Sequence, residues 1–87
     1  MSRLEDADPI IAAIRRLTGS RGPDRTCCPS EVARRVAADD WRSAMSAVRA
    51  AAVTLACRGE IDICRGGLTL DPEAPLRGPI RLRRRGC

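Results

Sequence analysis

The chain has no histidine, lysine, tyrosine or phenylalanine, and it has a single tryptophan, Trp41. Without histidine it lacks both the usual general base near neutral pH and the commonest metal ligand in proteins. It also has no glycine-rich phosphate-binding loop and no nucleophile motif. The sequence therefore predicts a protein that is not an enzyme and that uses no cofactor, no metal and no small-molecule substrate.

Long apolar runs are absent as well. The longest stretch without a charged residue, residues 50–57, is eight residues long, whereas a helix that crosses a bilayer needs ~20. The first eight residues are charged and lack the apolar core of a signal peptide. Five cysteines, an odd number without a secretory route, favour reduced thiols. We therefore expect a soluble, cytoplasmic protein with no membrane partner.

The order of the predicted elements indicates the fold class. Asp8 and Pro9 are typical of a helix start, and Gly66-Gly67 can form the two-residue turn of a hairpin. The expected helices are 9–18 (ending at Gly19), 29–38 and 41–58; the expected strands are the hairpin 60–64 and 68–70 with 78–84 as a third, and residues 25–27 fit a very short additional strand. This order predicts an α+β fold, a winged helix-turn-helix with three helices and a two- to three-stranded antiparallel sheet.

Positive charge is concentrated at the C-terminal end of the chain. Residues 1–76 contain eleven arginines and eleven acidic residues, whereas residues 77–87 contain five arginines and no acidic residue. We expect one domain, residues 1–87, with an ordered core over 9–83 and a basic tail over 84–87. The charged end fits two interpretations: an arm that contacts nucleic-acid phosphates, or an edge strand that outward charges protect from aggregation.

The helix expected at 41–58 would be the recognition helix of a DNA-binding protein. Its apolar stripe leaves small residues on the opposite face: Ser43, Ser46, Ala50, Thr54 and Cys57. Arg42 and Arg49 lie on one flank, but the helix has no asparagine or glutamine with which to read bases. Small side chains permit close approach by a DNA backbone or by another helix, so scaffolding or protein docking stands beside base recognition.

The cysteines give a third interpretation. Cys28 directly precedes Pro29 at a helix start, where the helix dipole and the nearby Arg25 would favour a thiolate, although a small buried packing residue is the simpler interpretation. Cys57 lies on the outer helix face by spacing, but its place beside the hairpin also fits a core residue, as does that of Cys64. Adjacent cysteines with no CxxC motif do not favour a metal site.

Three segments carry a resemblance to a known family: Cys-Pro-Ser-Glu-Val-Ala-Arg at residues 28–34, Asp-Trp-Arg at 40–42 and Gly-Pro-Ile-Arg-Leu at 78–82. Together they resemble the small bacterial family of domain of unknown function 3253, over nearly the whole chain. The resemblance implies a winged-helix-like fold with no assigned biochemistry, and it supplies no catalytic residues.

We therefore expect a non-enzymatic winged-helix binding module, first of all one that binds nucleic acid (DNA) with low specificity through its basic end and hairpin tip. The alternatives are a protein-interaction or homodimerisation module and a redox sensor at Cys28. The residues expected to contact nucleic acid are Arg34, Arg42, Arg49, Arg65, Arg81, Arg83, Arg84 and Arg85.

Overall fold

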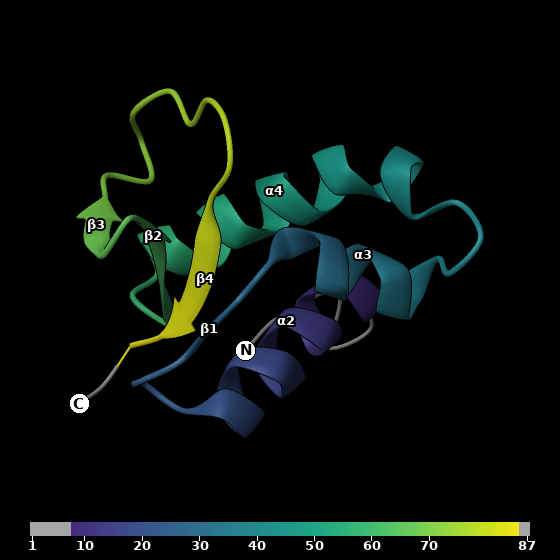
Figure 1. Ribbon diagram of the computed structural model, residues 1–87, viewed down its shortest axis with the longest axis horizontal. Coiled ribbons are helices and arrows are strands. Elements are labelled where there is room, and N and C mark those ends of the chain that lie inside the picture. Colours follow the sequence, from purple (N-terminus) through teal and green to yellow (C-terminus); the bar gives the residue numbers. More distant parts are fainter. Residues whose placement is uncertain (1–7, 86–87) are drawn as a thin grey trace.

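The computed structural model describes residues 8–85, which form three helices and a four-stranded antiparallel sheet (Figure 1). In chain order the elements are α2 (Pro9–Arg21), β1 (Thr26–Cys27), α3 (Pro29–Val36), α4 (Trp41–Cys57), β2 (Ile61–Arg65), β3 (Leu68–Leu70) and β4 (Arg81–Arg84). The predicted α+β class is confirmed, and the element order is compatible with a winged helix-turn-helix. Among the residues described, no helix combines the length and apolar character needed to cross a lipid bilayer.

The start of α2 agrees with the prediction, but its end does not. The side chain of Asp8 accepts hydrogen bonds from the N–H groups of Ile10 (2.8 Å) and Ile11 (3.4 Å), which caps the helix. The predicted end at Gly19 is wrong, because α2 continues to Arg21. Gly22 ends it instead: it has a φ of 76°, and its N–H donates to the carbonyl of Thr18 (3.0 Å).

The strands are arranged in the order β1-β4-β2-β3, so the C-terminal strand is inside the sheet. In β4, Leu82 pairs with Cys27 of β1 on one side and with Ile63 of β2 on the other. The interpretation of the basic segment as an edge strand is therefore wrong. The sheet has four strands rather than two or three, because the very short strand considered at residues 25–27 forms as β1 and pairs with β4, which in turn pairs with β2 of the hairpin. The hairpin turn is as predicted, with φ values of 55° at Gly66 and 85° at Gly67.

An aliphatic core lies between the helices and one face of the sheet. Five of its side chains come from four different elements and are fully buried: Ile14, Val48, Leu55, Ile63 and Leu82. Trp41, the first residue of α4, is only partly buried and packs against this core. Alternation along β4 places Arg81 and Arg83 on the opposite, outer face of the sheet.

Candidate nucleic-acid interface

The loop of residues 71–80, which joins β3 to β4, is attached to α4 by an arginine. Arg49 of α4 donates from Nη2 to the carbonyl oxygen of Leu76 over 2.6 Å. Arg65, at the end of β2, donates from Nε to the carbonyl of Pro79 (3.0 Å) and from Nη2 to that of Arg77. The loop consequently lies beside α4 (Figure 1). The carbonyls orient both guanidinium groups but do not neutralise them.

The exposed face of α4 is the one that the helical spacing predicts. Ser43, Ser46, Ala50, Thr54 and Cys57 are all exposed. Two of the hydroxyl groups are engaged locally, since Ser43 donates to a carboxylate oxygen of Asp40 (2.7 Å) and Thr54 donates to the carbonyl of Ala50 (3.2 Å). This face is therefore shallow and carries few groups able to read a base edge.

Trp41 joins the beginning of α4 to α3 through two arginines. The guanidinium carbon of Arg34 lies 4.5 Å from the centre of the Trp41 ring, and that of Arg42 lies 4.7 Å from it. Both distances are within the range of a cation–π interaction. Three residues that the sequence singled out separately thus form one cluster, and its two cations keep their charge at the surface.

The arginines of β4 are engaged differently, since two of them share one carboxylate. Arg83 donates to Oδ2 of Asp62 (3.1 Å), and Arg85 lies 2.9 Å from Oδ1 through Nη2 and 3.0 Å through Nε. Partial burial tends to raise the pKa of Asp62, but hydrogen bonds and charge from the two arginines outweigh it and lower the pKa. Arg81 donates from Nε to the hydroxyl of Thr26 (2.9 Å). The strand expected at residues 78–84 is therefore present as β4, over Arg81–Arg84, with part of its charge neutralised.

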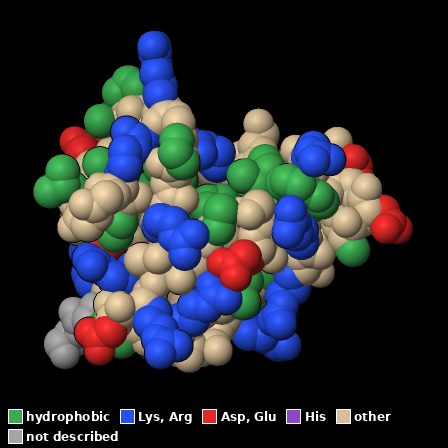
Figure 2. Space-filling view, in the orientation of Figure 1, with side chains coloured by type: hydrophobic (Ala, Val, Ile, Leu, Met, Phe, Trp, Pro, Cys, Tyr) green, Lys and Arg blue, Asp and Glu red, His purple; other side chains and the backbone are tan. Residues whose placement is uncertain are grey.

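Arg84 points away from these neighbours and has a different environment. It is exposed, and within residues 8–85 no hydrogen bond or ion pair holds its side chain. It is the last residue of β4, within the strand expected at residues 78–84. Figure 2 shows the arginines of this face of the molecule spread over the sheet and helices, with acidic and uncharged surface between them.

One ion pair near α3 was not predicted. Arg21 holds both carboxylate oxygens of Glu31, each at 2.7 Å, and the N–H of Cys28 donates to the same carboxylate (2.7 Å). The hydrogen bonds from Arg21 and from the Cys28 backbone lower the pKa of Glu31 to about 2. The signal that could have helped is the Glu three residues after the helix cap, as in a capping box.

The described cysteine side chains differ in their exposure to solvent. Cys27 is fully buried, and desolvation raises its pKa to about 11. Cys28 is half-buried and accepts a hydrogen bond from the Ser30 hydroxyl (3.1 Å), and its N–H donates to the Glu31 carboxylate. Cys64 is buried, whereas Cys57 is exposed, so a core position for Cys57 is wrong.

The family of the chain follows from a comparison with family models. The model described as "Protein of unknown function (DUF3253)" matches residues 7–85. The chain belongs to this family. A search of curated proteins finds no match. DUF3253 is a family of unknown function, so membership assigns no role to this protein.

In this DUF3253 protein the nominated arginines form separate groups rather than one band. Arg34 and Arg42 meet at Trp41, and Arg49 and Arg65 meet along the loop of residues 71–80. Arg81, Arg83, Arg84 and Arg85 lie along the C-terminal strand and just after it, facing two sides of the sheet. Sequence reasoning did not single out Arg77, which is exposed in the same loop.

Proposed function

We propose that this protein is a non-enzymatic nucleic-acid-binding module of the winged-helix type. In this proposal α4 lies against duplex DNA and the loop of residues 71–80 serves as the wing. The observation that carries it is the hydrogen bond from Arg49 to the carbonyl of Leu76, because it joins the helix and the loop into one surface. A winged helix uses these two elements together when it contacts DNA.

The charges available for phosphate contacts come mainly from the helices and the loop. Arg34 and Arg42 rest on an aromatic ring, and Arg49 and Arg65 donate to carbonyls, so all four keep their positive charge. The exposed Arg77 adds a fifth. Arg83 and Arg85, by contrast, share the carboxylate of Asp62 and contribute less. Guanidinium groups in such positions bind phosphates as paired donors.

We expect little sequence selectivity from this surface. The exposed face of α4 consists of small residues, whereas base reading in the major groove requires long side chains with paired donors and acceptors. Asp39 and Asp40 precede α4 and repel phosphates, which weakens binding at the start of the helix. Contacts of this kind fix the orientation of a protein on DNA without specifying a sequence.

Fluorescence anisotropy with a labelled duplex at low salt tests the proposal. We expect a Kd below about 10 µM, the tighter end of the range for non-specific binders. If four phosphates are contacted, the slope of log K against log salt should be about −3.6. Arg77→Gln and Arg42→Gln should each weaken binding, while Arg16→Gln, a matched charge change on α2, should not. Failure of every duplex and single strand to bind would rule the proposal out.

A protein-interaction module is the second candidate, and one observation favours it. β3 is an edge strand of the sheet, and its Leu68 is 70% exposed, an unusual position for a large apolar side chain. A partner strand or a second copy could cover this edge, and the small-residue face of α4 could contribute to a homodimer. Sedimentation equilibrium decides the homodimer case: a monomer at high concentration excludes it. The cytoplasmic location stays a prediction under both candidates.

A further inference from the structure

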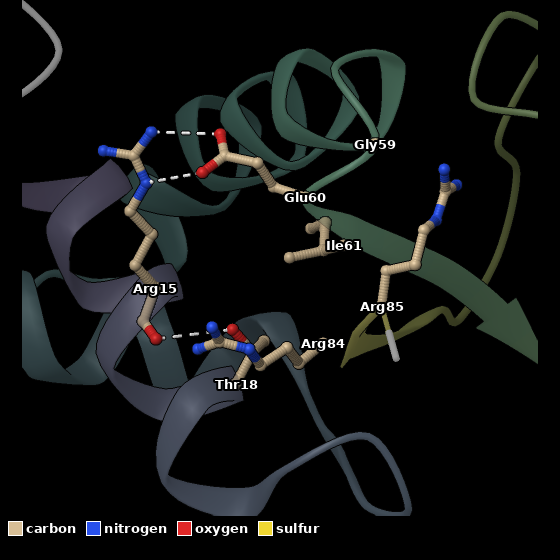
Figure 3. Close-up of a pocket in the computed structure, with 7 residues that line it drawn as sticks. All are labelled: Arg15, Thr18, Gly59, Glu60, Ile61, Arg84 and Arg85. Carbon is tan, nitrogen blue, oxygen red and sulfur yellow. Dashed lines mark hydrogen bonds and ion pairs between the residues drawn. The ribbon is translucent and has the colours of Figure 1, made fainter. Parts of the chain in front are cut away.

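A pocket of about 290 Å³ opens at the end of β4 opposite the end that the loop of residues 71–80 enters. Side chains from α2, from the turn after α4 and from the C-terminal end of β4 line it (Figure 3). Three of them are arginines, Arg15, Arg84 and Arg85, and the side chain of Ile61 lies among them. The volume is at the small end of the range for ligand pockets.

The charges around this pocket do not balance. Arg15 is matched by Glu60, whose two oxygens accept from its Nε (3.1 Å) and Nη2 (3.0 Å). Arg85 and Arg83 share Asp62, so two arginines there face one carboxylate. Arg84 has no hydrogen-bond or ion-pair partner within residues 8–85. Four guanidinium groups and two carboxylates give this end of the sheet a net charge of +2 among the described residues.

Two glycines make room for the guanidinium groups that face the pocket. A Cβ on Gly19, inside α2, would lie 3.0 Å from Nη1 of Arg84, and a Cβ on Gly59 would lie 3.1 Å from Nη1 of Arg85. Glycine inside a helix is unfavourable relative to alanine. At position 19 it allows the Arg84 guanidinium to lie directly against the helix backbone. Arg85 donates its Nε and Nη2 to Asp62, which leaves Nη1 as its donor on the pocket side.

We propose that this pocket binds a small phosphate-bearing anion, either inorganic phosphate or a phosphate monoester, with Arg84 and Nη1 of Arg85 donating to its oxygens. A doubly charged phosphate matches the net charge of +2, and guanidinium groups suit its several acceptor oxygens. The pocket shares no residue with α4 or with the loop of residues 71–80, the two elements of the proposed nucleic-acid surface, so either proposal can fail without the other.

NMR titration of the whole protein at constant ionic strength tests this site. The probes are inorganic phosphate and glycerol 3-phosphate, and glycerol and chloride are the controls. We expect saturable shifts at the Gly19 and Gly59 amides and at the Arg84 and Arg85 side-chain N–H groups, for the two phosphates only. Shifts that stay linear up to ~20 mM of both phosphates would show that no such site exists.

Three variants separate directed binding from general charge. Arg84→Gln should weaken phosphate binding about tenfold or more, since it removes a charged hydrogen-bond donor. Gly19→Ala should also weaken it while keeping every charge and favouring the helix, because the flexible Arg84 side chain must move away from the new methyl group. Arg77→Gln should leave phosphate binding unchanged although it weakens DNA binding. Equal effects of Arg84→Gln and Arg77→Gln on phosphate affinity, or no effect of Arg84→Gln, would overturn the proposal.

Discussion

The arginines of the C-terminal strand and those around α4 differ in what they contact. By sequence the C-terminal segment holds the whole net charge of +5, and residues 1–76 sum to zero. In the structure two of the C-terminal arginines share Asp62, whereas the helical arginines contact an aromatic ring or carbonyl oxygens. Only a carboxylate neutralises a guanidinium group, so the arginines around α4 keep a charge that a count along the chain does not reveal.

The largest expected effect tests whether the C-terminal segment is a strand rather than a tail. Leu82 is fully buried in the centre of β4, between the two arginines of its outer face. Leu82→Ala should lower the free energy of unfolding by about 3 kcal/mol, because it leaves a cavity in the core. Urea unfolding measures this. The same substitution at Leu68, which is 70% exposed, should cost far less. Equal costs at the two leucines would contradict the position of β4.

Asp62→Asn should have the next largest effect on stability, and it tests directly whether the arginines of the C-terminal strand are neutralised by this carboxylate. The carboxylate is only 12% exposed and is contacted by two guanidinium groups, so its loss should cost about 2 kcal/mol of stability. It also releases Arg83 and Arg85, which should steepen the salt dependence of DNA binding by up to about 1.8 in the log–log slope.

The exposed Asp39 provides the stability control for this change, since Asp39→Asn removes the same charge at a site with no hydrogen-bond or ion-pair partner within residues 8–85. Asp39→Asn should leave the urea midpoint nearly unchanged. If Asp62→Asn destabilised the protein yet left the salt slope unaltered, Arg83 and Arg85 would not contribute to DNA binding after their release from Asp62.

The local features of this protein could be predicted from its sequence, and the long-range ones could not. Helical spacing gave the exposed face of α4, and Gly66-Gly67 gave the hairpin, because both depend on neighbouring residues. The insertion of β4 between β1 and β2 depends on pairing across distant segments, which no local pattern specifies. The sharing of Asp62 by two arginines follows from that register and was missed for the same reason.

The side-chain contacts of the candidate site, like the strand pairing, could not be predicted from local sequence patterns. The sequence singles out the arginines as a class, but their partners, which it does not reveal, decide which of them are available to a phosphate. Gly19 illustrates the point, since its sequence context resembles a helix end while it lies inside α2, close to the guanidinium group of Arg84 from the other end of the chain. Arg77 was overlooked because it was counted only as part of a basic segment, although it lies in the loop that α4 holds.

Two carboxylates with lowered pKa values, Glu31 of α3 and Asp62 of β2, should contribute to the pH dependence of stability. The pKa of Glu31 is lowered to about 2 from an ordinary value of 4.5. A lowered carboxyl pKa adds stability that is complete above the ordinary value, declines below it and is lost as the pH falls through about 2. Because the side chain is 38% exposed, we expect at most about 1 kcal/mol.

Glu31→Gln should therefore lower the urea midpoint at pH 6 and remove part of its decline between pH 5 and pH 2. Asp62→Asn should remove another part, since the Asp62 pKa is lowered too. The double variant should be the least pH-sensitive of the set. A wild-type decline that neither substitution reduces would mean that other carboxylates control acid unfolding.

The smallest expected effect concerns the helical arginines themselves. Arg34 lies over Trp41, and its neighbour Arg35 is exposed on the same helix with no ring contact. Arg34→Gln should cost about 0.5 kcal/mol, the value of an exposed cation–π contact, and Arg35→Gln should cost less. Trp41 is the sole tryptophan and the chain has no tyrosine, so its fluorescence reports both unfolding and the ring's surroundings. Arg34→Gln should change the emission of the folded protein, and Arg35→Gln should not. If both variants left the emission unchanged, Arg34 would not be held against Trp41. The contrast with the paired arginines of the C-terminal strand would then depend only on the arginines that contact the loop of residues 71–80.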